Sequence, residues 1–246
     1  MPTHTYLQSS KDKVVVITGG STGIGLEAAR LFAAEGARVT ILARGADKLA
    51  AAIENLAATP EAGIARDRLH SAAVDVTDEA AVQAALADIE RRDGRIDILV
   101  NNAGVGFATD LASVGTDDYR RIIDTNLTGV FHAVRAVLPG MKARKSGHII
   151  NVSSIVGKIA NPVAPIYCAS KHALNGYTSG LQQQVAADNI RVSLVSPASV
   201  DTDYWAGRTV DRAKFLKPAE VAAAIHFIAA QPEGVLIKDL DLAALR

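Results

Sequence analysis

Short runs of consecutive apolar residues alternate along the chain with longer segments in which apolar residues recur at helical spacing. The run at residues 14–17 consists only of Val and Ile, a pattern that indicates a strand buried on both faces. Seven such strands and six helices are expected in alternation. The strands are expected at 14–17, 39–43, 69–76, 96–100, 148–152, 190–195 and 235–240, and the helices at 23–36, 47–56, 78–91, 116–143, 164–187 and 218–230.

This alternation predicts an α/β fold, a Rossmann-type doubly wound parallel sheet of about seven strands with helices on both faces. No linker-like segment divides the 246 residues, so we expect one domain that begins with a polar extension at residues 1–12. Thr77 is expected to cap the helix at 78–91. Ligands of such folds bind beyond the carboxyl ends of the strands, which is where functional residues should lie.

Composition excludes several classes of protein. The 26 Lys and Arg residues balance the 26 Asp and Glu residues, which gives no general attraction to nucleic acid or to an anionic membrane. Cys168 is the single cysteine, so no intramolecular disulfide can form. The polar start and the short apolar stretches predict a cytoplasmic protein without a signal peptide or membrane span. The six histidines show no metal-ligand spacing, so no metal site is expected.

A glycine-rich turn follows the first predicted strand. Glycine allows a tight turn and a close approach to a pyrophosphate, and the next helix offers free backbone N–H groups. Such turns also serve as plain connections, but the position between a buried strand and a helix favours phosphate binding. The expected contacts are Gly19, Ser21, Thr22, Gly23, Ile24 and Gly25.

The spacing Thr-Gly-x-x-x-Gly-x-Gly resembles the classical short-chain dehydrogenase/reductase (SDR) family, and further motifs follow over nearly the whole chain. Asn101-Asn102-Ala103-Gly104 resembles the family's Asn-Asn-Ala-Gly element. The resemblance implies an oxidoreductase that moves a hydride between a nicotinamide cofactor and a carbonyl or alcohol substrate, and a homodimer or homotetramer. It implies four catalytic residues, Asn126, Ser154, Tyr167 and Lys171.

The chemistry of Tyr167 and Lys171 can be argued from their spacing. They lie four positions apart on a predicted helix and therefore share one face. A neighbouring ammonium favours the phenolate and lowers the phenol pKa, which makes Tyr167 a proton donor or acceptor near neutral pH. The alternative is an ordinary surface Tyr packed on a Lys stem.

Ser154 and Asn126 also have alternative interpretations. Ser154 ends the fifth predicted strand and can hold the substrate oxygen, but the adjacent Ser153 competes, because successive strand residues face opposite sides. The family spacing to Tyr167 favours Ser154. Asn126 can be a buried amide bonded to backbone, whereas the resemblance assigns it a structural role and a proton relay through water to Lys171.

The residues after the second strand predict the cofactor. An acid there would select NAD, but the chain has Ala43 and Arg44, and an arginine can bind the 2′-phosphate of NADP(H). A solvated loop arginine is the alternative. Asp75 resembles the adenine-contacting Asp of the family, or it is a helix N-terminal acid. The resemblance adds as cofactor contacts Asn102, Ala103, Gly104, Tyr167, Lys171, Pro197, Val200 and Thr202.

Apolar residues dominate the loops expected around the substrate, which favours an apolar ketone or secondary alcohol. Tyr204 and Trp205 can equally be loop anchors. Ala198 stands where the family usually has Gly, and Leu240-Asp241-Leu242 replaces a common Asp-Gly-Gly element. A catalytically silent NAD(P)-binding regulatory protein is the rival function. The expected pocket residues are Phe107, Ile155, Val156, Tyr204 and Trp205.

Overall fold

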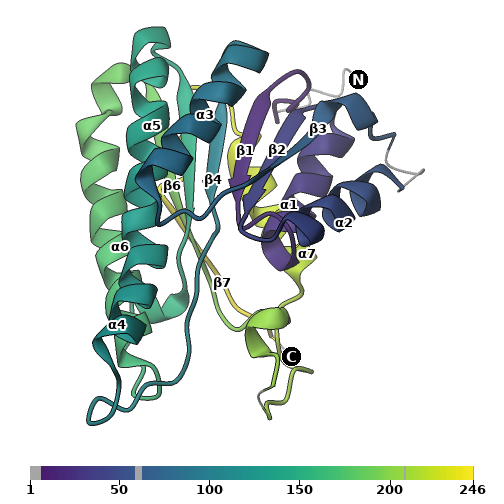
Figure 1. Ribbon diagram of the computed structural model, residues 1–246. Helices are drawn as coiled ribbons and strands as arrows, with labels where there is room; N and C mark the ends of the chain where they lie inside the picture. Colours follow the sequence, from purple (N-terminus) through teal and green to yellow (C-terminus); the bar gives the residue numbers. More distant parts are fainter. Residues whose placement is uncertain (1–6, 59–62, 208, 246) are drawn as a thin grey trace.

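A single seven-stranded parallel sheet organises the protein, in the strand order β3-β2-β1-β4-β5-β6-β7 (Figure 1). The computed structural model describes residues 7–58, 63–207 and 209–245. The direction in which successive strands are added to the sheet reverses between β1 and β4. This position is the topological switch point, at which such sheets bind ligands. The strands are β1 (Val14–Thr18), β2 (Arg38–Ala43), β3 (Leu69–Ala73), β4 (Ile98–Asn101), β5 (Gly147–Val152), β6 (Ile190–Pro197) and β7 (Asp239–Leu242).

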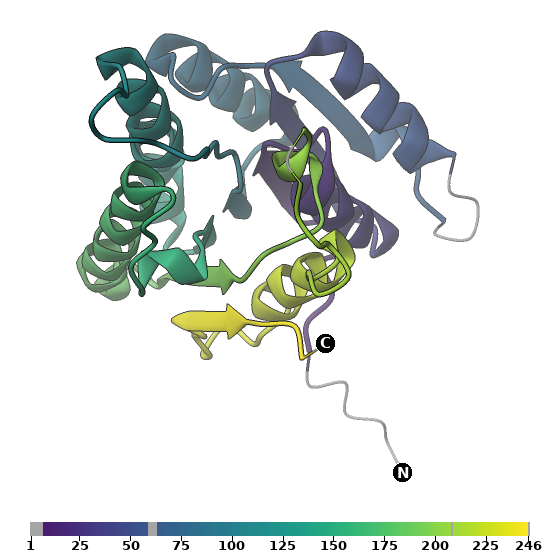
Figure 2. The same ribbon diagram turned by 90° about the horizontal axis from the view of Figure 1, so that it is seen from below.

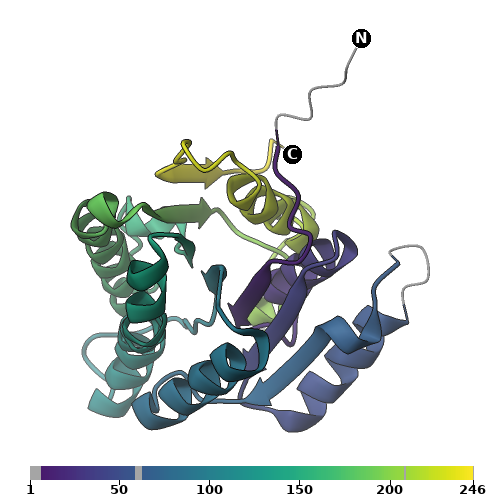
Figure 3. The ribbon, with the colours of Figure 1, turned by 90° about the horizontal axis from the view of Figure 1, so that it is seen from above.

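Helices cover both faces of the sheet, as Figure 1 and the view from above in Figure 3 show. One apolar core joins the sheet to α1, α2 and α7, and a second core joins it to α3, α5 and α6. The predicted doubly wound fold is therefore confirmed. The helices are α1 (Gly23–Ala34), α2 (Ala46–Ala57), α3 (Glu79–Asp93), α4 (Thr116–Ile123), α5 (Gly129–Arg144), α6 (Pro165–Gln184) and α7 (Pro218–Ala229).

The first strand shows why its residues are all apolar. Val15 and Ile17 pack in the core beneath α1, whereas Val14 and Val16 pack in the core beneath α3 and α5. Alternate residues of a strand point to opposite faces, and both faces of β1 are covered. The strand is consequently buried along its whole length.

Several predicted boundaries differ from the structure by two residues or more. The helix expected at 116–143 is divided into α4 and α5 by a π-helical turn, η3 (Asp124–Thr128). The third strand ends at Ala73, and the last strand begins at Asp239 instead of residue 235. Propensity and periodicity do not report such boundaries, because tertiary hydrogen bonds decide where pairing starts and stops.

Thr77 was the wrong N-cap for α3. The cap is Asp78, whose Oδ1 accepts a hydrogen bond from the Ala81 backbone N at 3.0 Å. The Thr77 hydroxyl instead donates to Asp75 Oδ1 at 2.8 Å. A carboxylate is a strong acceptor for the free N–H groups of a helix N-terminus, and it occupies the capping position here.

Candidate active site

A cleft of about 810 Å³ opens at the carboxyl edge of the sheet, the edge that faces the reader in Figure 2. Its volume lies within the usual range for small-molecule and cofactor sites. The cleft brings together all of the predicted catalytic, cofactor and pocket residues except Gly25 and Asn126. These two are buried behind its wall.

The glycine-rich turn is shaped by contacts that exclude side chains. Gly19 has a φ of +66°, and a β-carbon there would lie 2.9 Å from the Ala103 Cα. A β-carbon on Gly25 would lie 2.6 Å from the Asn102 amide nitrogen. Asn102 Nδ2 also donates to the carbonyl oxygens of Thr18 and Gly19, at 3.1 and 3.0 Å. Gly25 therefore serves the packing of the turn against β4 and does not itself line the cleft.

The N-terminus of α1 opens into this cleft. Its N-cap, Thr22, has extended backbone and makes no side-chain capping bond, so the first backbone N–H groups of the helix keep their donor capacity. Free N–H groups and the positive end of the helix dipole together favour a bound anion.

Tyr167, on α6, forms a side-chain hydrogen bond with Ser154. Ser154 caps the short helix η4 (Ile155–Gly157), where its Oγ accepts from the Val156 backbone N at 3.4 Å. Ser153 Oγ is used elsewhere, because it donates to Asn175 Oδ1 at 2.5 Å. The geometry thus favours Ser154 over Ser153 as the hydroxyl that accompanies Tyr167.

Lys171 does not lower the pKa of Tyr167 in the way its spacing predicts. Burial and the nearby Tyr204 raise the pKa of Tyr167, and the bond to Ser154 opposes them. Lys171 Nζ lies 5.8 Å from the centroid of the Tyr167 ring and donates to the Val152 carbonyl oxygen at 2.9 Å. The ammonium therefore lies over the face of the Tyr167 ring. Burial also lowers the pKa of Lys171 itself to about 8.

Asn126 lies inside the π-helical turn η3 and is completely buried. Its Oδ1 accepts from the Val105 backbone N, and its Nδ2 donates to the Val105 carbonyl oxygen, both at 2.8 Å. Nδ2 also contacts Ser170 Oγ at 3.0 Å. Asn126 is therefore a buried amide that is bonded to backbone, which was one of the two interpretations that the sequence allowed. It fixes the segment after β4, where a β-carbon on Gly104 would lie 3.3 Å from Asn126 Oδ1 and 3.7 Å from Lys171 Nζ.

The opposite end of the cleft carries Arg44, Asp75 and a residue that sequence reasoning missed, Lys48. Asp75 Oδ1 accepts from the Thr77 backbone N at 2.9 Å. Burial opposes ionisation of Asp75, but the hydrogen bonds from Thr77 and the charge of Arg44 outweigh it and lower the pKa. Lys48 lies in the first turn of the helix that follows Arg44, and this closeness in the sequence was a usable signal for a second cation at this place.

Aromatic side chains line the end of the cleft that holds Tyr167, which is the proposed catalytic end. The ring centroids of Tyr204 and Tyr167 are 6.0 Å apart, and Trp205 packs on Tyr204 at 5.1 Å and on Phe215 at 5.0 Å. Trp205 Nε1 donates to the Val200 carbonyl oxygen at 3.0 Å. Tyr204 and Trp205 both line the cleft, and Trp205 also anchors its own loop.

Two further residues at this end were not predicted. A β-carbon on Gly106 would lie 2.6 Å from the Tyr167 ring and 2.7 Å from the Tyr204 hydroxyl, so only glycine fits between these tyrosines. Arg121 lines the cleft, and its guanidinium lies 5.8 Å from the centroid of the Phe107 ring. The spacing along α4 gave no reason to single out Arg121.

Ala198, which stands where the family usually has glycine, causes no backbone strain. The non-glycine residues with positive φ in the described part of the chain are Asp12, Lys145 and Asn189, so Ala198 keeps an ordinary conformation. The Ala198 backbone N donates to the Leu242 carbonyl oxygen at 2.8 Å. The loop that follows β6 therefore starts from a position fixed by β7.

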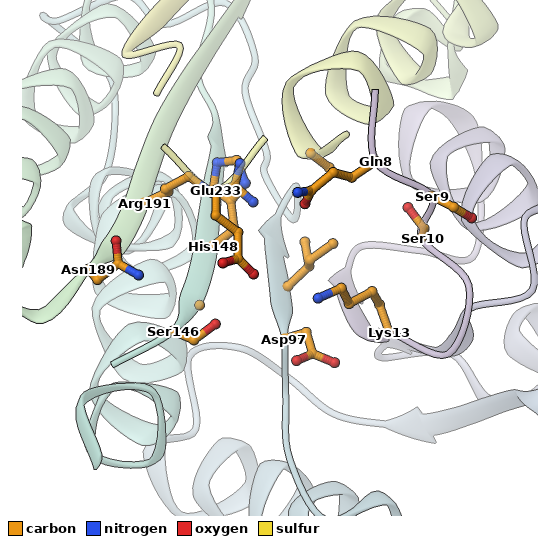
Figure 4. Close-up of a pocket in the computed structure, with 13 residues that line it drawn as sticks. Gln8, Ser9, Ser10, Lys13, Asp97, Ser146, His148, Asn189, Arg191 and Glu233 are labelled. Atoms are coloured by element: carbon orange, nitrogen blue, oxygen red, sulfur yellow. The ribbon is translucent and has the colours of Figure 1, made fainter. Parts of the chain in front are cut away.

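A second, much smaller cavity of about 40 Å³ lies at the amino edge of the sheet (Figure 4). Polar residues line it, among them Lys13, Asp97, His148, Arg191 and Glu233. Within residues 7–58, 63–207 and 209–245, no group of His, Cys, Asp and Glu could hold a metal ion. No helix of that described part is long and apolar enough to cross a membrane.

Comparison with known proteins gives the class of protein. The sequence pattern of the short chain dehydrogenase family matches residues 13–213. An uncharacterized oxidoreductase of Staphylococcus saprophyticus is 34% identical, over 92% of this chain and 94% of that protein. The dehydrogenase/reductase SDR family member 7B of Bos taurus is 35% identical, over 78% of this chain and 59% of that protein. The chain belongs to the short-chain dehydrogenase family.

Solved structures agree with this assignment. An alcohol dehydrogenase from the archaeon Thermococcus sibiricus, complexed with 5-hydroxy-NADP, has a TM-score of 0.85 and 28% identity and covers 95% of this chain and 97% of its own. A metagenomic short-chain oxidoreductase in complex with NADP has a TM-score of 0.83 and 33% identity and covers 97% of this chain and 100% of its own.

Proposed function

We propose that this protein is an NADP(H)-dependent oxidoreductase that interconverts a carbonyl compound and its alcohol, with Tyr167 as the general acid and base. The observation that carries the proposal is the placement of Ser154, Tyr167 and Lys171 in one cleft with the glycine-rich turn. The NADP and 5-hydroxy-NADP complexes of similar structures support the choice of cofactor.

The cleft is large enough for a dinucleotide. At Gly19 the turn has no side chain, so a phosphate can approach its backbone closely. When bound, the nicotinamide cofactor supplies or accepts the hydride. The turn and the N-terminus of α1 would hold the pyrophosphate, Arg44 the 2′-phosphate and Asp75 the adenine. The nicotinamide and its ribose would be held by Asn102, Ala103, Gly104, Lys171, Pro197, Val200 and Thr202.

Ser154 and Tyr167 would bind the oxygen of the substrate. The raised pKa of Tyr167 keeps the phenol protonated at neutral pH, so Tyr167 can give its proton to the oxygen during reduction. Oxidation is the reverse of this step and starts from the Tyr167 phenolate, which accepts the proton of the alcohol. Asn126 holds the Val105 backbone and with it the wall beside Lys171. We also propose that protons pass between Lys171 and Asn126 through water.

An apolar ketone or secondary alcohol is the proposed substrate. Phe107, Ile155, Val156, Tyr204 and Trp205 all line the catalytic end of the cleft. The sequence places two arginines, Arg208 and Arg212, in the loop that follows β6. Arg212 is paired with Asp201 at 3.2 Å and lines no part of the cleft. Arg208 lies outside the described residues. Arg121 is therefore the cation to test at this end.

Steady-state reduction of an apolar ketone and a phosphorylated ketone of similar size, followed at 340 nm, tests the substrate class. We expect a higher kcat/KM for the apolar ketone. A higher value for the phosphorylated ketone that is lost in Arg121→Ala, but kept in Arg212→Ala, would contradict it. Tight cofactor binding without turnover on any carbonyl or alcohol would favour the silent regulatory protein instead.

The Arg44→Asp variant tests the cofactor. The wild-type protein should prefer NADPH to NADH, and the variant should lose or reverse this preference, because a carboxylate replaces a guanidinium beside the 2′-phosphate. We expect the ratio of the two kcat/KM values to change by roughly tenfold or more. Equal kcat/KM values for NADPH and NADH in the wild type would refute the proposed cofactor.

A further inference from the structure

Lys48 lies on the first turn of α2 and lines the same end of the cleft as Arg44. Its aliphatic stem runs back along the helix toward Gly45. The Cβ, Cγ and Cδ atoms of Lys48 lie 3.8 to 4.0 Å from the position that a β-carbon on Gly45 would occupy. Side chains of a helix lean toward its N-terminus, and this course carries the ammonium toward the loop that bears Arg44.

No ion pair among the described residues involves either Arg44 or Lys48. Asp75 is the one carboxylate that lines this end within the described part of the chain, and it accepts two hydrogen bonds from Thr77. Asp47, next to Lys48 in the sequence, does not line the cleft. Two cations thus share one end of the cleft without a carboxylate paired to either.

The N-cap of α2 adds donors of a third kind. Gly45 makes no side-chain capping bond, so the first backbone N–H groups of this helix have no side-chain acceptor. A β-carbon on Gly45 would meet only the stem of Lys48, and Arg44, Gly45 and Lys48 all line the cleft. A guanidinium, an ammonium and free backbone N–H groups are the donors that bind a compact dianion.

We propose that Lys48 is a second specificity-determining residue, which binds the 2′-phosphate of NADP(H) together with Arg44. This inference rests on the proposed NADP(H) function. A phosphate monoester carries a charge of about −1.5 to −2 at neutral pH, more than one guanidinium neutralises. Arginine offers a planar, bidentate contact and lysine a mobile point charge, so the two can bind different oxygens of one phosphate.

Calorimetric titration with 2′,5′-ADP and with 5′-AMP, which lacks only the 2′-phosphate, isolates that group without any need for turnover. We expect Lys48→Ala to weaken binding of 2′,5′-ADP by about threefold to tenfold and to leave 5′-AMP within twofold of wild type. Lys48→Arg should retain most of the affinity. Lys11→Ala removes the same charge from an exposed site outside the cleft, and it should change neither affinity.

The double variant Arg44→Ala/Lys48→Ala sharpens the test. Two residues that bind one phosphate should show a combined loss that differs from the product of the single losses. Unchanged binding of 2′,5′-ADP in Lys48→Ala, or an equal loss for both nucleotides, overturns the role of Lys48. Equal wild-type affinity for the two nucleotides would instead overturn the NADP(H) preference itself, and the role of Lys48 with it.

Discussion

The two edges of the sheet contain similar chemical groups and differ in how those groups are used. The carboxyl edge holds the cleft of about 810 Å³, and the amino edge holds the cavity of about 40 Å³. At the amino edge the polar groups bind one another: Arg191 donates to the Gln231 carbonyl oxygen at 2.7 Å, and Asp97 accepts from the Val14 backbone N at 2.8 Å. At the carboxyl edge neither Arg44 nor Lys48 forms an ion pair with a described residue.

His148 and Lys171 make the comparison sharper, because burial lowers the pKa of both. Ser193 Oγ donates to the Ile237 carbonyl oxygen, so His148 Nε2 must be the donor in its 2.9 Å bond to Ser193. Its lowered pKa makes His148 neutral at neutral pH, and its Nδ1 is buried without a hydrogen-bond partner among the described residues. Lys171 faces an open cleft with Tyr167 beside it. A shifted pKa therefore does not identify the active edge, whereas free volume next to a second reactive group does.

The largest expected effect is at Tyr167. Tyr167→Phe removes the transferable proton and should lower kcat by roughly 10²–10⁴, with cofactor binding nearly intact. Tyr177→Phe is the matched control, since it removes a hydroxyl from the same helix outside the cleft. Steady-state kinetics and fluorescence titration with NADPH measure the two quantities. Near-normal turnover in Tyr167→Phe would show that another group supplies the proton.

Lys171→Met should show an intermediate effect that depends on pH. The pKa of Lys171 is about 8 in the folded protein, against an ordinary value of 10.5. Between these values the unfolded chain binds more protons, so the stability of the wild type rises with pH across this window, and the cost of burying the charge is largest below it. The variant should lose this rise.

Denaturant unfolding between pH 7 and 10 measures the loss. Lys11→Met, an exposed lysine, is the control for a missing positive charge and should keep the wild-type profile. Lys171→Met should also weaken cofactor binding, because the ammonium is proposed to bond the nicotinamide ribose. Unchanged cofactor affinity would show that Lys171 does not bind the ribose. An unchanged dependence of the free energy of unfolding on pH would show that the pKa of Lys171 is not lowered in the folded protein.

The smallest expected effect on turnover is at the amino edge. His148→Ala leaves Ser193 Oγ without its donor and opens a small void, which should lower the free energy of unfolding by about 1–3 kcal/mol. The values of kcat and KM should stay within twofold of wild type. A loss of catalysis comparable with that of Lys171→Met would mean that the two edges are coupled and that the contrast between them is wrong.

The sequence predicted those parts of the site that depend on spacing within one element or on the order of motifs. The turn at Gly19, the pair Tyr167 and Lys171, and the position of Arg44 are of this kind. The sequence did not predict contacts between distant segments. Gly106 is required by Tyr167 and Tyr204, which lie far from it in the chain and meet only after folding. The same holds for the acidity of Tyr167, which depends on burial and on Tyr204 and not on helical spacing.

The fold shows the same division. Uninterrupted apolar runs predicted the central strands, because a strand that is buried on both faces needs an apolar side chain at nearly every position. The edge strand β7 was misplaced by several residues, since its start depends on backbone pairing with β6, and the apolar residues at 235–237 that suggested an earlier start are not part of the strand. Asn126 could be recognised as an unusual residue in a helix, but the π-helical turn around it follows from its bonds to Val105, which no local pattern encodes.

The π-helical turn at Asp124–Thr128 also limits how the length of this segment can change during evolution. A π turn contains one residue more than the α-helical path needs. Deleting that residue would give an unbroken α-helix and would leave α4 and α5 in phase, so Ile122 would stay in the core. The backbone between the two helices would follow a different path, and Asn126 would lose its present position beside the Val105 backbone. One residue can therefore be lost here without disturbing the core, but not without disturbing the wall of the cleft.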